Sequence, residues 1–348
     1  MKRIFILVVV VLLLVAAFFI GKPLYNYHFK TLDTLGDSEG YILYVPSAAT
    51  VQTIADSLSK HELMSETEFL DFAEKFELTD EKVEAGKYRL SGGMKIKSLI
   101  YGLKNGNQEV KDVQITFNNS RDIYDMAAKV APAIEADSAE IVNHLEDPET
   151  LLKFGFTKAT IPSLFLPDTY EIGEWDMSAE EFVRFMADQY KEFWDEERQA
   201  KAIKLGITQS EVATVASIIE AEQGINQQEW PTIAGLYLNR IRDNWKLQSD
   251  PTAKFCWGDE LEGVQRLLQV HMQKDCPYNT YLYPGLPPGP IRIPSKKAID
   301  AVLNAERHNY YYMCARPDNS GLHNFAYSLS EHNSNAAKFR KYLRTLGL

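Results

Sequence analysis

Two glutamates, Glu220 and Glu222, follow an apolar run in the stretch TVASIIEAEQG (214–224). Residues 212–219 carry no charge, and a carboxylate set against apolar surface loses hydration, so such a group is retained chiefly where it has chemical work to do. If the stretch ends a helix, the partial negative charge of the helix C-terminus and partial burial both raise the pKa of an acid there. A carboxyl group that keeps its proton near neutral pH suits a general acid.

The helix itself is predicted from its two ends. Thr208 and Glu211 have the spacing of a capping box, and Gly224 is suited to the position after the C-terminus. At 100° per residue, Glu220 lies on one edge of the apolar stripe beside small side chains, and Glu222 lies on the opposite edge. The angle alone does not choose between them. The alternative is that both are solvated glutamates at a frayed helix end.

Polar residues that suit a sugar-binding cleft follow downstream. Tyr278 and its neighbours offer hydroxyls, an amide and flat rings together, and Asp250 is expected to be extended because Pro251 follows it. The segment 283–294 is expected to be a fixed loop, with a polyproline ligand for a partner domain as the alternative. The candidates for binding substrate or positioning the acid are Asn239, Arg240, Gln248, Asp250, Thr252, Tyr278, Asn279 and Thr280.

Composition limits the class of protein. The chain has 348 residues, 45% of them hydrophobic and 24% charged, which indicates ordinary globular material in two or three domains. A net charge of −11 argues against nucleic acid as a partner. The chain has no C-x-x-C or H-E-x-x-H motif, and its histidines are scattered, so we expect no metal site. A disulfide between Cys256 and Cys276 is plausible in an oxidising compartment, but their spacing does not establish that they are close.

The N-terminus predicts a membrane anchor. Lys2 and Arg3 precede an unbroken apolar run over 4–20, which at ~1.5 Å per residue gives roughly 25 Å, enough for a bilayer core. A cleaved signal peptide is the alternative, but the run is long for one and no small-residue cleavage site follows it. The basic tip places the N-terminus in the cytoplasm and everything after residue 21 outside.

The predicted fold class is α+β. Residues 1–21 form the cytoplasmic tip and a single transmembrane helix, and 22–39 a connector. Residues 40–108 form a small subdomain in the order β-α-α-β, with strands at 41–45 and 87–90. This order resembles a LysM-type glycan-binding module, although a generic spacer domain is nearly as good an interpretation. Residues 109–348 form a larger, mostly helical catalytic domain with a few strands, the first at 113–117.

The motifs along the chain together resemble one family, the endolytic murein transglycosylases or YceG-like proteins. The resemblance spans nearly the whole chain, and the order of its motifs makes it specific. These motifs are FLPDTY (165–170), ASIIEAE (216–222), LNR (238–240), LQSDPT (247–252), YNTY (278–281), GLPPGPI (285–291) and SEHN (330–333).

The resemblance implies a catalytic residue and a reaction. Glu220 would be the catalytic acid of a membrane-anchored lytic transglycosylase that cuts the MurNAc-β-1,4-GlcNAc bond of nascent peptidoglycan and leaves a 1,6-anhydro end. It implies no cofactor, and it implies peptidoglycan strands, the lipid bilayer through residues 4–20 and cell-wall synthases as partners. The chain departs from the family pattern at Ala221, Ser249 and Asn324, which leaves the contacts of those residues open.

Two other functions stay open. One is a peptidoglycan hydrolase with Glu220 and Asp250 as a carboxylate pair and an attacking water. The other is a membrane-tethered, non-catalytic glycan-binding protein. The predicted location is the bacterial cytoplasmic membrane, with the catalytic domain on its outer side.

Overall fold

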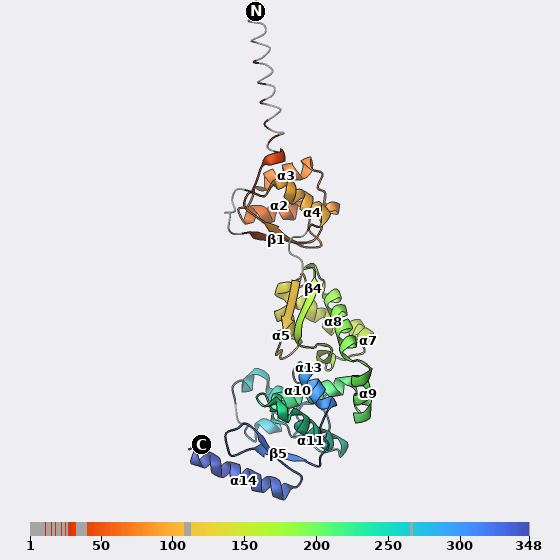
Figure 1. Ribbon diagram of the computed structural model, residues 1–348, viewed down its shortest axis with the longest axis vertical. Coiled ribbons are helices and arrows are strands. Elements are labelled where there is room, and N and C mark those ends of the chain that lie inside the picture. The colour runs from red at the N-terminus through yellow and green to blue at the C-terminus, as the bar shows by residue number, and fades with distance from the viewer. Residues whose placement is uncertain are drawn as a thin grey trace, which may run out of the picture. The chain divides into compact units, whose positions relative to one another are not determined.

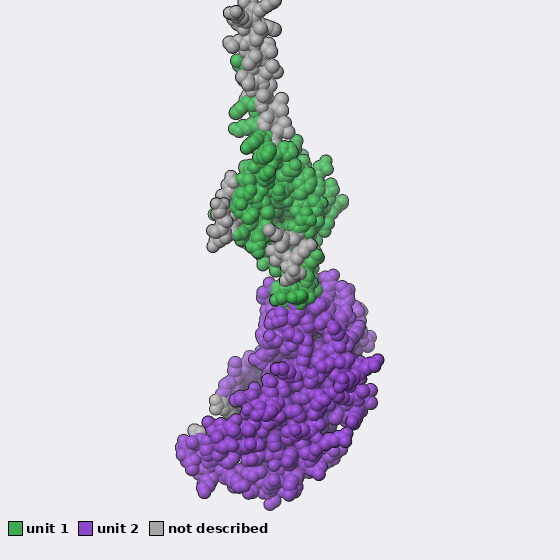
Figure 2. Space-filling view, viewed as in Figure 1, with its two compact units in different colours: residues 1–115, 133–135, 171–177 green, residues 116–132, 136–170, 178–348 purple. Residues whose placement is uncertain are grey.

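The computed structural model describes isolated positions between residues 11 and 25, and residues 27–32, 40–107, 113–264 and 267–347 (Figure 1). Contacts divide the chain into two compact units, coloured separately in Figure 2. Unit 1 consists of Met1–Ile115, Ala133–Glu135 and Glu171–Met177, and unit 2 consists of Thr116–Pro132, Ala136–Tyr170 and Ser178–Leu348. The predicted boundary at 108/109 lies outside the described residues.

The predicted membrane anchor also falls largely outside them. Of residues 4–20, only Val11, Val15 and Phe18 are described. Among the helices formed by described residues, none is long and apolar enough to span a bilayer.

Unit 1 follows the predicted β-α-α-β order. β1 (Tyr41–Val45) pairs antiparallel with β2 (Gly86–Leu90), and α2 (Val51–Lys60) and α3 (Glu66–Lys75) connect them. α4 (Ile96–Asn105) follows β2. Thr50 and Ser65 cap the two connecting helices as their side-chain types predict. The order of elements is therefore confirmed, while the likeness to a LysM module remains one of pattern.

The core of unit 1 is built from alternate strand residues and one face of each helix. Leu43, Phe69 and Ile100 are among its fully buried members. Leu32, from the predicted connector, also packs into this core, and its backbone N–H donates to the Met94 carbonyl.

Unit 2 is mostly helical. Its sheets are short: β3 (Val113–Phe117), which straddles the boundary of the units, pairs with β4 (Asp168–Gly173), and β5 (Tyr312–Ala315) pairs antiparallel with β6 (His323–Ala326). Its α-helices are α5 (Ile123–Val130), α6 (Ser138–Glu146), α7 (Pro148–Phe154), α8 (Ala179–Phe193), α9 (Glu196–Leu205), α10 (Gln209–Glu222), α11 (Trp230–Arg242), α12 (Asp250–Trp257), α13 (Lys296–Leu303) and α14 (Leu329–Thr345). Short 3-10 turns are η2 (Ala131–Ala133), η3 (Ile161–Leu164), η4 (Gln227–Glu229), η5 (Gly258–Leu261) and η6 (His271–Gln273).

Helix α10 is the central element of unit 2. It contacts α9, α11, α12, α13 and η3, and every residue from 212 to 219 is buried. The capping box between Thr208 and Glu211 is confirmed. The predicted one-sided apolar stripe is not seen, because an uncharged helix enclosed by neighbours buries its whole circumference. The helical angle could therefore not show which glutamate faces open space.

The proline- and glycine-rich segment before α13 is a fixed loop, as predicted. Its Ile291 N–H donates to Ser217 Oγ of α10 at 3.0 Å, and its Ile293 N–H donates to the Ser120 carbonyl at 3.1 Å. A Cβ placed on Gly289 would lie 1.9 Å from the Ala159 carbonyl oxygen. Only a glycine fits this close approach of two backbones.

We therefore predict that Gly289→Ala destabilises the protein by about 1–3 kcal/mol, because the added methyl forces the loop away from Ala159. Gly224→Ala is the matched control, since a Cβ there meets nothing within 4 Å. Chemical denaturation of both variants measures the difference. Equal stability of the two variants would contradict the close packing of the loop.

Candidate active site

A cleft of about 840 Å³ in unit 2 lies beside the C-terminal end of α10. Its lining contains five acidic and three basic side chains, so the cleft carries charges of both signs. The lining residues are Asn119, Arg121, Asp122, Ala221, Glu222, Asp250, Pro251, Lys254, Phe255, Gly258, Asp259, Leu261, Glu262, Ile291 and Arg292.

Glu222, the last residue of α10, places its side chain in this cleft. Ser249 Oγ, which is fully buried, donates to Glu222 Oε2 at 3.0 Å. Tyr237, buried on α11, lies near this carboxyl group and favours its charged form. The carboxyl group is thus held from the protein side while its residue borders open space.

Burial raises the pKa of Glu222 to about 7, and the negative charge of Asp250 acts in the same direction. The hydrogen bond from Ser249, the positive charge of Arg240 and the nearby Tyr237 hydroxyl oppose the rise. Burial outweighs these three effects. Glu222 therefore has the property expected of a general acid near neutral pH.

Glu220, the acid selected by the family resemblance, is placed differently. Its Oε2 accepts the backbone N–H of Ser295 at 2.9 Å, and Ser295 is the N-cap of α13. A carboxylate in this position stabilises the positive end of a helix. Glu220 is absent from the lining of the cleft. The geometry gives it a structural contact and leaves the cleft to Glu222.

The end of α10 is fixed by a buried polar network. The Gln223 carbonyl accepts from Trp230 Nε1 at 2.7 Å, and Gln223 Nε2 donates to Glu229 Oε2 at 2.9 Å. Glu229 Oε1 also accepts the backbone N–H of His323 on β6 at 2.9 Å, and Glu229 Oε2 lies 2.9 Å from His323 Nδ1. Gly224 does not take the left-handed conformation suggested by its position. Side-chain contacts end the helix instead.

Asp250 is one of the predicted candidates that the structure brings into the cleft beside Glu222. It is the first residue of α12, so the expectation that it is extended is wrong. Pro251 falls in the first turn of α12, where a proline suits a helix because no intrahelical donor is needed. Tyr281 donates its hydroxyl to Asp250 Oδ1 at 2.5 Å.

Four other candidates use their side chains to bind the protein's own backbone. Asn239 Nδ2 donates to the carbonyls of residues 308 and 310, and Arg240 donates to those of 247 and 311. Asn279 Nδ2 donates to the carbonyls of residues 272 and 274, and Thr252 Oγ1 donates to the Ser249 carbonyl at 2.7 Å. These residues hold the walls of the site.

The remaining candidates are placed as follows. Thr280 Oγ1 accepts the backbone N–H of Ser249, which orients the serine toward Glu222. Tyr278 packs against Phe255 of the cleft lining, with ring centroids 4.6 Å apart. Gln248 has an exposed side chain and a positive φ of 50°, a strained conformation directly before Ser249.

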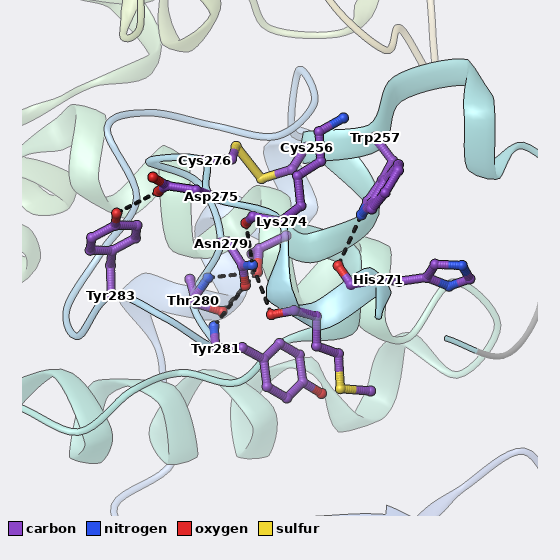
Figure 3. Close-up of a disulfide and its surroundings, with 12 residues drawn as sticks. Cys256, Trp257, His271, Lys274, Asp275, Cys276, Asn279, Thr280, Tyr281 and Tyr283 are labelled. Atoms are coloured by element: carbon purple, nitrogen blue, oxygen red, sulfur yellow. Dashed lines mark hydrogen bonds between the residues drawn. A yellow bond between two sulfur atoms is a disulfide. The ribbon is translucent and has the colours of Figure 1, made fainter. Parts of the chain in front are cut away.

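A disulfide joins Cys256 of α12 to Cys276, with their Cα atoms 6.0 Å apart (Figure 3). In the same view Asn279 turns its amide into the bend that holds Cys276, and Trp257 donates from its indole to the His271 carbonyl. The bridge therefore links the helix that begins with Asp250 to the turn that carries Thr280.

Several residues of the site were not selected from the sequence. The family resemblance favours Glu220 over Glu222, and the only sign of Ser249 in the sequence is its departure from the family pattern. Arg121, Lys254 and Arg292 line the cleft from three separate segments, and no sequence spacing connects them. Their charges were the only available signal. Among the described residues, no group of three or more His, Cys, Asp or Glu side chains could hold a metal ion.

A glutamate with a raised pKa borders a charged cleft at the end of the central helix of unit 2, an arrangement that suits acid–base chemistry. Comparison with known proteins then places the chain: the YceG-like family matches residues 43–338. The chain belongs to the YceG-like family, and the predicted recognition is confirmed.

Similar proteins carry a consistent name. A protein of Bacillus subtilis (strain 168) named endolytic murein transglycosylase is 27% identical over 309 residues, which cover 85% of this chain and 83% of that protein. One of Streptococcus pneumoniae serotype 2 with the same name is 24% identical over 321 residues, covering 84% of this chain but 57% of that protein. The crystal structure of a putative YceG-like protein from Listeria monocytogenes shares the fold, with a TM-score of 0.53, 22% identity and coverage of 85% of this chain and 98% of that one.

The raised pKa of Glu222 predicts how stability varies with pH. Between about pH 4.5 and about pH 7 the folded state binds a proton that the unfolded state has released, so the free energy of unfolding falls as pH rises through this window. Replacing Glu222 with Gln removes the penalty, and we expect Glu222→Gln to gain on the order of 1–3 kcal/mol over wild type at pH 8 relative to pH 4. Denaturant titrations at several pH values measure it.

Glu220→Gln is the control for this measurement, since it changes the same group two residues away. Because it leaves Glu222 in place, it should keep the fall in the free energy of unfolding with rising pH that Glu222→Gln loses. A Glu222→Gln curve parallel to wild type from pH 4 to 8 would contradict the raised pKa.

The disulfide should contribute about 3 kcal/mol to stability, as expected for a loop of this order of length. We predict that the double variant Cys256→Ser/Cys276→Ser is less stable than wild type by this amount. Cys314→Ser, at the free cysteine, should still lose stability when reductant breaks the disulfide. Denaturation with and without reductant measures both. A wild-type protein indifferent to reductant would rule out a stabilising bridge.

Proposed function

We propose that this chain is a peptidoglycan lytic transglycosylase whose general acid and base is Glu222. The names of its relatives support the class of enzyme. The observation that carries the choice of residue is the contact pattern of the two glutamates: Glu222 borders the cleft with a pKa of about 7, and Glu220 accepts the N-terminal amide of α13.

The reaction needs one carboxyl group acting twice. Protonated Glu222 gives its proton to the oxygen that links the muramoyl C1 to the next sugar, and that C–O bond breaks. The resulting carboxylate then takes the proton of the muramoyl C6 hydroxyl as its oxygen bonds to C1. The product is a 1,6-anhydro end, no water is consumed, and Glu222 regains its proton. A pKa near 7 suits both transfers.

The residues around Glu222 would support this cycle. Ser249 hydrogen-bonds the carboxyl group from the buried side and fixes its orientation toward the cleft. Asp250 lies near enough for its charge to raise the pKa of Glu222. The same negative charge would stabilise positive charge developing at C1 when the bond breaks.

Asp250 also favours a second candidate function. Two carboxyl groups in one cleft are the equipment of an ordinary glycosidase, in which one acid protonates the leaving group and the other activates water or attacks the sugar. A peptidoglycan hydrolase using Glu222 and Asp250 would produce hydrated reducing ends. Tyr281, which donates to Asp250, would hold that carboxylate in place.

We propose that the enzyme acts outside the cytoplasmic membrane, tethered through residues 4–20. The disulfide between Cys256 and Cys276 supports an oxidising compartment, because such bonds persist there and are rare in the cytosol. Tethering would confine cleavage of the MurNAc-β-1,4-GlcNAc bond to nascent strands near the membrane. Cell-wall synthases are then the expected neighbours, and termination of strand elongation the expected outcome.

The test compares wild type, Glu222→Gln and Glu220→Gln on purified peptidoglycan, with products identified by mass spectrometry. We expect anhydro ends from wild type and from Glu220→Gln, and a loss of at least about 10²-fold in rate from Glu222→Gln, the contribution of a positioned general acid. Gln in place of Glu220 keeps an oxygen that accepts from the Ser295 amide.

Each alternative has its own result. Loss of activity in Glu220→Gln with retention in Glu222→Gln would return the catalytic role to Glu220. Products heavier by one water would establish the hydrolase. Intact strands from all three proteins would favour a glycan-binding function.

A further inference from the structure

Three cationic side chains line the cleft, and the proposed chemistry uses none of them. They are Arg121, Lys254 and Arg292. Arg121 is paired with Asp122 and with Asp259, at 3.1 and 2.5 Å. Lys254 donates to the Val264 carbonyl, and Arg292 donates from Nη2 to Asn119 Oδ1. Within the described part of the chain, no carboxylate forms an ion pair with Lys254 or Arg292.

Arg292 is held more rigidly than an ordinary surface arginine. The residues on either side, Ile291 and Ile293, are buried and donate their N–H groups to Ser217 Oγ and to the Ser120 carbonyl. Asn119 fixes one end of the guanidinium. The side chain therefore loses little further freedom when it binds a ligand.

The guanidinium of Arg292 also has unused hydrogen-bonding capacity. Its Nε has no partner among the described residues but is enclosed, so a ligand in the cleft would reach the guanidinium through its Nη groups. A guanidinium presents its N–H groups in a planar fork that matches a carboxylate, and such charge-assisted pairs are stronger than neutral hydrogen bonds. An arginine fixed in a cleft, without a carboxylate of its own, is suited to a carboxylate on the ligand.

Peptidoglycan has its carboxylates on the sugar that would be cut. The muramoyl residue bears a lactyl group on O3, which ends in a carboxylate or in an amide-linked peptide with free carboxylates. Since the proposed reaction occurs at C1 of this sugar, its O3 substituent must enter or border the same cleft. A sugar without the lactyl group brings no such charge.

We propose that Arg292 binds a carboxylate carried by the O3 substituent of the muramoyl residue and so selects the sugar whose bond is cut. The inference rests on the proposed function, because it assumes that peptidoglycan is the substrate. Asn119 is the positioning residue of this contact, since it holds the guanidinium. Glu222 supplies the proton, and Arg292 determines which sugar of the strand lies beside Glu222.

The test measures kcat/KM on three preparations of glycan strands. The first carries peptides with free carboxylates, the second is the same material with those carboxylates converted to methylamides, and the third is stripped of peptide by an amidase to leave the lactyl carboxylate. Wild type is compared with Arg292→Gln, with Arg292→Lys, which keeps the charge, and with Arg307→Gln, an exposed arginine outside the cleft.

We expect Arg292→Gln to lose about 10- to 100-fold in kcat/KM on carboxylate-bearing strands, mainly through KM, as for loss of a charge-assisted hydrogen bond. On methylamide strands, wild type should fall to the level of the variant. Arg292→Lys should lie between the two, and Arg307→Gln should match wild type. If Arg292→Gln loses kcat/KM only on peptide-bearing strands, Arg292 binds the peptide carboxylate. If it loses kcat/KM only on stripped strands, Arg292 binds the lactyl carboxylate.

Other results would overturn the inference. Wild type that cleaves methylamide strands as well as it cleaves both the peptide-bearing and the stripped strands has no carboxylate site, and this comparison holds even if Arg292→Gln fails to fold. An equal loss for Arg292→Gln on all three preparations, with a lowered melting temperature, would make Arg292 structural. Absence of cleavage by wild type on every preparation would remove the proposed function and this inference with it.

Discussion

Burial of one carboxyl group at the end of the central helix is the constraint on which the site depends. Glu222 closes α10, a helix enclosed on all sides by unit 2. Loss of hydration there raises its pKa to about 7 against the hydrogen bonds that favour the charged form. The cost is stability lost as pH rises from about 4.5 to about 7, a common feature of sites that need a perturbed group.

The surroundings of Glu222 keep that carboxyl group in one place. The network of Gln223, Glu229 and His323 ends the helix directly after it. Thr280 orients Ser249, and the disulfide at Cys256 ties α12 to the same turn. The side chains of Asn239, Arg240, Thr252 and Asn279 bind backbone within the walls, which preorganises the few groups that face the cleft.

The two acids show where sequence reasoning stopped. The capping box at Thr208 and Glu211 predicted the start of α10, and the position of Gly224 predicted its end. The choice of Glu220 over Glu222 rested on a family motif, since the helical angle does not separate the two acids. Because α10 is buried all round, an angle measured from an apolar stripe had no outside face to refer to. The two Oε2 contacts, to Ser295 and to Ser249, separate the acids.

The sequence by itself determined the order of elements in unit 1, the strand at 113–117, the loop over 283–294 and the family, because these follow from local periodicity, turn chemistry and motif order. Only the tertiary structure decided which glutamate borders the cleft, that Cys256 meets Cys276, and that cations from three segments line one cavity. Desolvation and contact between residues far apart in sequence exist only once the chain has packed, and both effects fall off within a few ångströms.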